Sequence, residues 1–422
     1  MEKYSHPSGF WRPGFGPTPA SPAAILSGMR LRIAGVLVLL IAAFLTFNFF
    51  RPIPAVPVTA AVPSQSTTAG TVPGLPWPKG GSAAVAVSGL GMLANSGSET
   101  AMPAASVAKV MTALLILEDK PLKRNEQGPS ILITDQDVRT YQADKADQQS
   151  VVEVTAGEQL SEFQALEGLL IPSANNFAFT LANWDAGSVD KFVANMNKRA
   201  KGLGLSHTKF ADSAGASALT VSTPSDLVAL GMTAMNQDVF AQIVATASAK
   251  LPVAGTVYNV DYALGQSGII GIKTGSGFQG ANFLFAASTT VGSFTKIVFG
   301  CVMGLPTLDD AFAAAKALIA AVQPNLVVKR ILSKYQAVGS YELPWGGRSD
   351  LLSSANVDLI EWPGMILRQS VRAPALAITQ PIPSGTTEGA LHVVLGDYNF
   401  DVSLTTADAL YPPGRFWRLT RI

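Results

Sequence analysis

The hydrophobic pattern of this chain begins with one long run that contains no charged position. Residues 33–50 are 18 consecutive uncharged residues, bracketed by Arg30, Arg32 and Arg51. As an α-helix this run is about 27 Å long, close to the hydrocarbon thickness of a bilayer. Because it is apolar on every face, the pattern predicts a transmembrane helix over 33–50 and argues against a buried helix of a soluble domain.

Basic residues around this helix predict its orientation. Lys3, Arg12, Arg30 and Arg32 precede it, and the next lysine after Arg51 is Lys79. The excess of positive charge on the N-terminal side predicts a cytoplasmic tail over 1–32 and an extracytoplasmic location for everything after the helix. A cleaved signal peptide is the alternative. Two features argue against a cleaved signal peptide: the run is long for the apolar part of such a peptide, and the tail before the run is long as well.

Residues 51–80 are rich in proline, serine, threonine and glycine, with seven prolines between 52 and 78. This composition is typical of an extended, semi-rigid chain. We therefore expect 51–80 to be a linker that lifts the following domain off the membrane.

From residue 81 to about 325 the pattern is that of a folded domain that mixes strands and helices. Short apolar runs predict strands over 83–87, 269–273, 282–288 and 295–303. Helical periodicity predicts helices over 107–117, 158–183 with an interruption at Pro172, 190–203, 225–235 and 308–322. Thr223 and Pro224 provide a cap and a first residue for the fourth of these helices. This mixture indicates an α/β or α+β domain.

Residues 326–422 have a different pattern. Apolar and polar residues alternate over 391–395 and 400–404, and turn residues recur about every ten positions. This is typical of a small all-β domain.

Composition excludes several kinds of function. Charged residues make up 14% of the chain and the net charge is +1, so no basic surface for nucleic acid is expected. The single cysteine, Cys301, lies in a run that predicts a buried strand, and it excludes both an internal disulfide and a cysteine-rich metal site. The three histidines are far apart in sequence, which argues against a multi-histidine metal site. No Gly-x-Ser-x-Gly motif accompanies them, as a serine–histidine triad of the hydrolase type requires.

The chemistry of the chain centres on Ser106 and Lys109. Ser106 follows the turn 103–105, and Lys109 leads into an apolar helix. At a spacing of three residues the two side chains share one helix face. A desolvated lysine can be neutral and accept the proton of a serine hydroxyl, which is too weak an acid to react without a base.

A Ser-x-x-Lys motif is a weak signal alone, because three others occur at Ser188/Lys191, Ser206/Lys209 and Ser293/Lys296. We interpret those as ordinary solvated lysines. Two later motifs distinguish the pair at 106 and 109. One is Ser173-Ala174-Asn175, although Ser354-Ala355-Asn356 repeats its pattern. The other is Lys273-Thr274-Gly275, whose glycine permits close approach of a ligand to the backbone.

Together and in this order, the three motifs resemble those of the penicillin-recognising serine enzymes. Their surroundings are similar to the D-alanyl-D-alanine carboxypeptidase family, the low-molecular-mass penicillin-binding proteins. The segments that carry this likeness are 106–115, 168–176, 196–205, 207–212 and 271–275. The resemblance covers roughly 80–325 and, more weakly, 326–422. It implies an α+β fold of the β-lactamase/transpeptidase type, with an antiparallel sheet flanked by helices.

The resemblance also implies a role for each motif residue. Ser106 is expected to attack the bond between two terminal D-alanines of a peptidoglycan stem peptide, and Lys109 to take its proton. Ser173 is expected to relay a proton to the leaving amine, with Lys273 polarising that network. Asn175, Thr274 and Gly275 are expected to contact the substrate. The backbone N–H groups of Ser106 and Ser276 are expected to form the oxyanion hole. No metal or cofactor is required, and β-lactams are expected to inhibit the enzyme.

The chain departs from the family pattern at a few positions. Asn176 and Ser276 stand where many members have aspartate and histidine. No basic residue lies between Lys296 and Lys316, where many members have an arginine for the substrate carboxylate. The missing arginine leaves open the alternative of a catalytically weak or inactive relative that binds wall peptide or partner proteins. A β-lactamase of the same fold is a further, less favoured alternative. His207 lies in the segment 207–212, which is similar to the family. The resemblance implies a structural role for this histidine.

Overall fold

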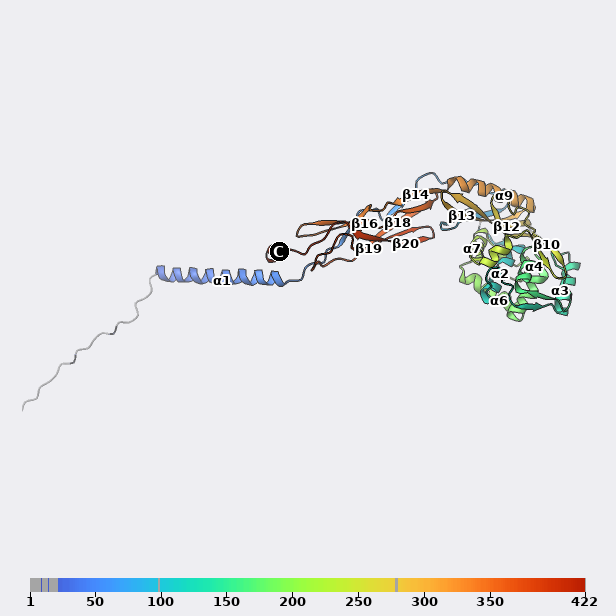
Figure 1. Cartoon of the computed structure of the whole chain (residues 1–422), viewed down its shortest axis with the longest axis horizontal. Helices are drawn as coiled ribbons and strands as arrows, with labels where there is room; N and C mark the ends of the chain where they lie inside the picture. Colours follow the sequence, from blue (N-terminus) through green and yellow to red (C-terminus); the bar gives the residue numbers. More distant parts are fainter. Residues whose placement is uncertain (1–8, 10–13, 15–21, 98, 278–279, 422) are drawn as a thin grey trace, which may run out of the picture.

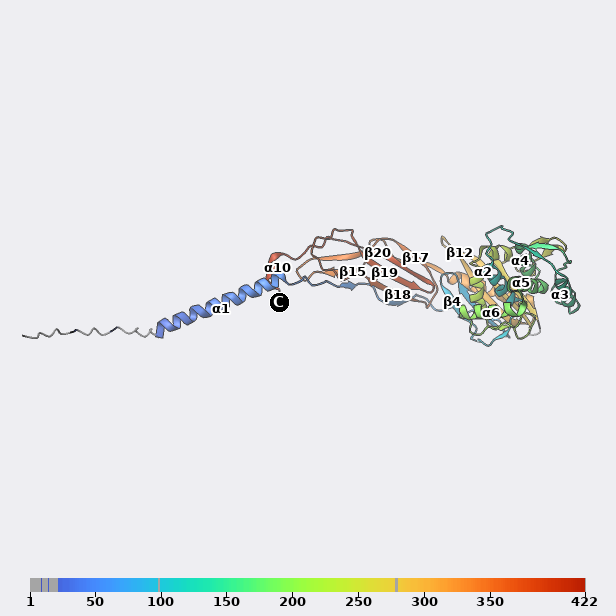
Figure 2. The same cartoon turned by 90° about the horizontal axis from the view of Figure 1, so that it is seen from below.

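The computed structural model describes residues 9, 14, 22–97, 99–277 and 280–421. The molecule is elongated (Figures 1 and 2). A long helix lies at one end, a β-rich domain follows it, and a domain of mixed helices and strands lies at the far end.

The mixed domain is built on one five-stranded antiparallel sheet. Its strands lie in the order β11-β12-β13-β3-β4. Their bounds are β3 Ser82–Val87, β4 Gly91–Asn95, β11 Ile269–Gly277, β12 Gly280–Val291 and β13 Phe294–Leu305. The four apolar runs that predict strands fall in β3, β11, β12 and β13, so those predictions are confirmed. The α+β prediction is confirmed as well.

Helices cover both faces of this sheet. Their bounds are α2 Lys109–Asp119, α3 Asp135–Ala146, α4 Glu162–Leu170, α5 Asn175–Ala186, α6 Val189–Gly202, α7 Pro224–Ala234, α8 Asp238–Val244 and α9 Leu308–Val322. Alternate strand residues point to opposite faces. Phe283 and Phe285 pack with α9, whereas Leu284 and Cys301 pack with the helices of the other face. The expected buried position of Cys301 is confirmed.

Helix ends follow the local sequence. Thr223 caps α7 by accepting a hydrogen bond from the N–H of Asp226, and Pro224 is the first residue of that helix, as predicted. The predicted interruption at Pro172 separates α4 from α5. Two-stranded antiparallel pairs complete the domain: β5 Met102–Pro103 with β8 Val221–Ser222, β6 Ser130–Leu132 with β7 Gln159–Ser161, and β9 Ser248–Leu251 with β10 Gly255–Tyr258.

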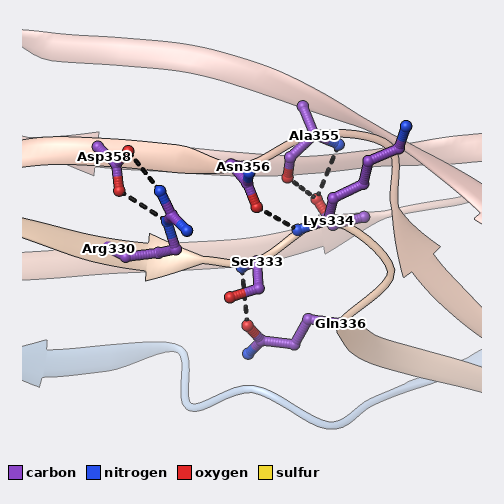
Figure 3. Close-up of polar contacts among 8 residues, drawn as sticks. Arg330, Ser333, Lys334, Gln336, Ala355, Asn356 and Asp358 are labelled. Carbon is purple, nitrogen blue, oxygen red and sulfur yellow. Dashed lines mark hydrogen bonds and ion pairs between the residues drawn. The ribbon is translucent and has the colours of Figure 1, made fainter.

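The β domain contains a seven-stranded antiparallel sheet in the order β1-β15-β16-β20-β19-β18-β2, and the separate pair β14-β17. The strands are β1 Val58–Ala60, β2 Gln65–Thr67, β14 Val327–Leu332, β15 Ala337–Glu342, β16 Arg348–Ser353, β17 Val357–Glu361, β18 Ile366–Arg372, β19 Thr387–Leu395 and β20 Tyr398–Thr406. The all-β prediction is confirmed. Figure 3 shows the pair β14-β17, where Arg330 binds both oxygens of Asp358 at 2.8 and 2.9 Å.

The expected linker is partly a structural element of this domain. Residues 58–60 pair with β15 and residues 65–67 pair with β18, at the two edges of the seven-stranded sheet. The expectation of a free spacer is therefore wrong for these residues. Their short segments between prolines cover sheet edges that solvent otherwise meets, which is a common way to protect an edge strand.

The N-terminal helix α1 spans Pro22–Phe50 and so begins earlier than residue 33. Its segment Leu26–Phe50 is long and apolar enough to cross a bilayer, with only 6% of its most apolar window buried in the protein. The helix extends through Arg30 and Arg32 because two charged residues at one end do not interrupt backbone hydrogen bonding. After β20, the short helix α10 Arg415–Thr420 returns the chain to the end of α1.

Candidate active site

Ser106 lies in a tight turn at the start of a helix. A 3₁₀ helix over Ala105–Ala108 leads directly into α2. The predicted helix 107–117 lies within this combined segment. Ala105 has a left-handed backbone, with φ of +48°. Such a conformation in a residue with a side chain is strained and needs support from its surroundings. It places Ser106 at the mouth of a cavity.

Lys109 is completely buried beneath Ser106. Its Nζ lies 2.7 Å from Ser106 Oγ, 2.7 Å from Asn175 Oδ1 and 3.0 Å from the carbonyl oxygen of Ala214. Burial, followed by the nearby charge of Lys273, lowers the pKa of Lys109 well below its ordinary value. The amine is therefore suited to accept the proton of Ser106, as the Ser-x-x-Lys motif predicts.

The second motif lies between α4 and α5. Ser173 is buried and has a left-handed backbone, with φ of +65°, and helix α5 begins at Asn175. This turn places both side chains on the cavity that Ser106 also lines. Asn175 also donates a hydrogen bond to Gln149 Oε1 at 3.1 Å. The next residue, Asn176, exchanges two hydrogen bonds with the backbone of Val152 and so supports the fold.

The third motif lies on β11 at the edge of the sheet. Lys273 is 1% exposed, and burial lowers its pKa to about 7. Its Nζ donates to the carbonyl oxygen of Thr274 at 3.1 Å. A Cβ on Gly275 would lie 3.0 Å from the carbonyl oxygen of Ala104 and 3.2 Å from the N atom of Ser106. Glycine at 275 therefore lets the strand lie directly against the backbone of Ser106.

One cavity of about 490 Å³ collects these residues. Ser106, Ser173, Asn175 and the segment 274–276 line it, while Lys109 and Lys273 lie buried behind its wall. Its other lining residues are Pro103, Ala105, Gln148, Gln149, Ser150, Gly215, Ala216, Ser217, Ala218, Val260, Tyr262, Gly277 and Leu308. The described lining contains neither a basic nor an acidic side chain at its surface.

The structure adds two positioning residues that the motifs do not indicate. Asp212 accepts hydrogen bonds from the N–H groups of Ala214, Gly215, Ala216 and Ser217, which shapes the loop above Lys109. Asn282 on β12 donates to the carbonyl oxygens of Pro103 and Ala104 at 2.9 and 3.0 Å and accepts from the N–H of Gly304. Both act through backbone groups, so residue type and spacing gave no signal for them.

The competing motifs lie elsewhere. Ser188 caps helix α6, Ser293 lies in the exposed turn between β12 and β13, and Ser354 and Asn356 are in the β domain. His207 is exposed, and its backbone N–H donates to Asp226 at 2.9 Å. Within the described residues, no group of three or more histidine, cysteine, aspartate or glutamate side chains is arranged to hold a metal.

Comparison with known proteins agrees with this site. A sequence model of the D-alanyl-D-alanine carboxypeptidase family matches residues 85–307, which include all three motifs. The chain belongs to this family. It is 36% identical to D-alanyl-D-alanine carboxypeptidase DacB2 of Mycobacterium tuberculosis over 196 residues, which cover 44% of this chain and 61% of the relative. It is 34% identical to DacF of Bacillus subtilis, over 29% of this chain and 30% of the relative. Each match spans less than two thirds of the relative.

Solved structures share the fold of this chain. The Streptomyces K15 DD-transpeptidase is 27% identical, with a TM-score of 0.51 over 60% of this chain and 98% of that chain. Penicillin binding protein 5 from Haemophilus influenzae is 18% identical and has a TM-score of 0.57 over 81% of this chain and 99% of that chain. The second likeness shows a shared fold that extends beyond the carboxypeptidase domain.

Proposed function

We propose that this protein is a membrane-anchored D,D-carboxypeptidase that removes the terminal D-alanine from peptidoglycan stem peptides. The short contact between Lys109 and Ser106, at the mouth of a cavity that the other two motifs line, carries this proposal. The family match supports the same activity.

The reaction proceeds through an acyl-enzyme. Neutral Lys109 takes the proton of Ser106 Oγ as that oxygen attacks the carbonyl between the last two D-alanines. The backbone N–H groups of Ser106 and Ser276 stabilise the oxyanion, a contribution typically worth several kcal/mol. Ser173 relays the proton held by Lys109 to the leaving amine, so free D-alanine departs and Lys109 is neutral again. Water then attacks the ester, with Lys109 as base, and restores Ser106.

Substrate binding is assigned to the cavity wall. Asn175 contacts the peptide amide of the substrate. The hydroxyl of Thr274 and the backbone of Gly275 contact the substrate terminus, with the charge of Lys273 behind them. The lack of a basic side chain in the described lining predicts weak recognition of the terminal carboxylate, which is the observation that favours the alternative of a catalytically weak relative.

The same lining bears on the third candidate. An efficient β-lactamase needs a group that activates water for rapid deacylation, and the described lining has no carboxylate to act as that base. This supports a long-lived acyl-enzyme with β-lactams, and hence inhibition by them.

We place the catalytic domain outside the cytoplasmic membrane. Helix α1 is long and apolar enough to span a membrane, and the basic residues before it favour a cytoplasmic N-terminus. Ser354 is exposed in the β domain, and Cys301 is buried. A membrane-impermeant thiol reagent added to intact cells is therefore expected to label Ser354→Cys. Labelling only after cell lysis would contradict the orientation.

Covalent labelling with a fluorescent penicillin tests the nucleophile. Wild type is expected to be labelled and Ser106→Ala is not. Ser293→Ala is the matched control, because Ser293 belongs to another Ser-x-x-Lys motif in an exposed turn. Absence of label on wild type, or equal label on Ser106→Ala, would contradict the proposal. Rapid turnover of the β-lactam would instead favour a β-lactamase.

A further inference from the structure

The C-terminal helix lies against the end of the membrane helix. Figure 2 shows α10 beside the last turns of α1, although the two are separated by most of the sequence. The β domain is thus attached to α1 twice, through the chain after residue 50 and through α10.

A polar lock joins the two helices. Asn48 is the only buried residue among those of α1 whose side chains are described, at 2% exposure. Its amide donates to the carbonyl oxygen of Arg421 at 2.8 Å and, more weakly, to that of Leu419 at 3.4 Å. A side-chain amide buried near the end of an apolar helix is costly unless it is hydrogen-bonded, and α10 supplies those bonds.

Arg421 completes the lock from the other side. Its guanidinium donates to the carbonyl oxygen of Asn48 at 2.8 and 3.2 Å and to that of Pro52 at 3.0 Å, and it also contacts the carbonyl oxygen of Arg51. The last carbonyls of a helix have no partner within the helix, and a cation is favourable there. The lock therefore satisfies the end of α1 at the point where it leaves the predicted membrane span.

Aromatic and basic side chains surround this lock, and we call them the collar. Phe47 and Phe50 of α1 and Tyr411 and Phe416 of the C-terminal segment are 62–79% exposed. Inside the collar, the rings of Trp345 and Trp417 lie 5.1 Å apart. The guanidinium of Arg418, itself part of the collar, lies 6.0 Å from the ring of Phe49. Arg415 is exposed as well. The collar residues are Phe47, Phe50, Tyr411, Arg415, Phe416 and Arg418.

We infer that the collar is a bilayer contact surface, and that it seats the β domain on the outer layer of phospholipid headgroups. Aromatic rings are enriched where a protein crosses the membrane–water interface, and arginines there reach lipid phosphates while their stems stay in apolar surroundings. The collar continues directly from the apolar span that ends at Phe50. The lock connects the collar to the β domain. This connection fixes the orientation of the catalytic domain relative to the membrane.

This inference rests on the proposed membrane location, and a depth measurement separates the two. A nitroxide is attached at Phe416→Cys in the full chain, in nanodiscs of phosphatidylethanolamine and phosphatidylglycerol. Ser354→Cys is the control. Trp345, whose ring lies inside the collar, precedes strand β16, and Ser354 follows the other end of that strand, so the length of β16 separates Ser354 from the collar. The label at 416 is expected to be more accessible to dissolved oxygen than to a water-soluble nickel relaxant, with the reverse at 354. A label at 416 as aqueous as that at 354 would overturn the collar, whereas failure of the chain to enter nanodiscs would overturn the membrane location instead.

Limited trypsin digestion of the same nanodiscs tests the lock. Asn48→Leu removes the amide but keeps an apolar helix, and cleavage after Arg418 is expected to become about tenfold faster because α10 detaches locally. Thr46→Leu is the matched control, since residue 46 is exposed on the same helix and belongs to neither the lock nor the collar, and its cleavage is expected to match wild type. Arg421→Lys, which keeps the charge but loses the planar guanidinium, is a second variant expected to accelerate cleavage. Wild-type cleavage rates in both lock variants would overturn the lock.

Discussion

The side-chain oxygen of Asn175 lies 2.7 Å from Nζ of Lys109. The family pattern assigns Asn175 to the substrate, and the structure shows that it also accepts a hydrogen bond from the proposed base, Lys109. Its own amide group donates to Gln149, which lines the same cavity. Asn175 therefore links the base to the wall where the substrate is expected to bind.

Asn175→Asp is expected to slow acylation at neutral pH. A carboxylate in contact with Lys109 raises the pKa of the amine, so less of it is neutral and able to act as base. The acylation rate with a β-lactam is expected to fall about tenfold or more at neutral pH and to recover as the pH rises. A pH profile that coincides with that of wild type would show that Asn175 does not influence Lys109.

Lys273→Met is expected to change the pH profile in three ways. Lys109 must be neutral to act as base, and Lys273 must stay protonated to polarise the site. With the pKa of Lys273 at about 7, the wild-type rate is expected to rise as Lys109 loses its proton and to fall as Lys273 loses its own. The variant is expected to lose the fall, to have a lower maximum rate, and to have its rise at higher pH, because a positive neighbour of Lys109 is gone.

The matched control for Lys273→Met is Lys250→Met on β9, where the side chain is exposed. Its profile is expected to coincide with that of wild type. If Lys273→Met kept the wild-type fall at alkaline pH, that limb would belong to another group.

The parts of the fold that were predicted are those in which the hydrophobic pattern is strong. The three long strands and helices α7 and α9 are apolar on at least one face and have clear caps or turns. Helix α3 has no such pattern, because Tyr141 is its only buried residue. Strands β1 and β2 were missed because single short segments between prolines pair only at sheet edges.

The site was predicted where residue type carries the chemistry. Ser106, Lys109 and Lys273 are of residue types that can react or carry charge, so their motifs are informative. Asp212 and Asn282 act by holding backbone groups that are distant in sequence, and a side chain with that task has no spacing rule. The contact between Asn48 and Arg421 joins two residues that are 373 positions apart and depends on how the domains fold.

Gly215→Ala is expected to disrupt the loop above Lys109. Gly215 has φ of +75°, and a Cβ there would lie 1.8 Å from the carbonyl oxygen of Ala105, so the loop or the nucleophile turn must move. We expect acylation to fall by about a hundredfold or more, since small displacements of reacting groups are costly. Gly204→Ala is the matched control: it has the same φ of +75° but open space around its Cβ position. It is expected to lose about 1 kcal/mol of stability and to keep its acylation rate.

Glu162→Gln is expected to stabilise the protein above neutral pH. Glu162 is fully buried, neither carboxyl oxygen has a hydrogen-bond partner, and burial raises its pKa from 4.5 to about 7. Between pH 4.5 and about 7, Glu162 holds a proton in the folded state that the unfolded chain has released. The free energy of unfolding therefore falls as the pH rises through this range to about 7. The variant avoids this loss, which is about 3 kcal/mol at full size.

Thermal unfolding of the detergent-solubilised chain measures this effect. Glu162→Gln is expected to raise the midpoint relative to wild type at about pH 8 by more than at about pH 5. The exposed Glu153→Gln is the control, with no such difference expected. Equal shifts of Glu162→Gln at both pH values would assign its effect to packing.

Release of D-alanine from a synthetic stem pentapeptide is the most direct measurement of the chemistry at Ser106. Wild type is expected to release free D-alanine and tetrapeptide in equal amounts, and mass spectrometry of quenched enzyme is expected to find the tetrapeptide acyl group on the segment that contains Ser106. Ser293→Ala is expected to behave as wild type, and Ser106→Ala to release none. No release by wild type that binds penicillin covalently, or equal release by Ser106→Ala, would contradict a D,D-carboxypeptidase with Ser106 as its nucleophile.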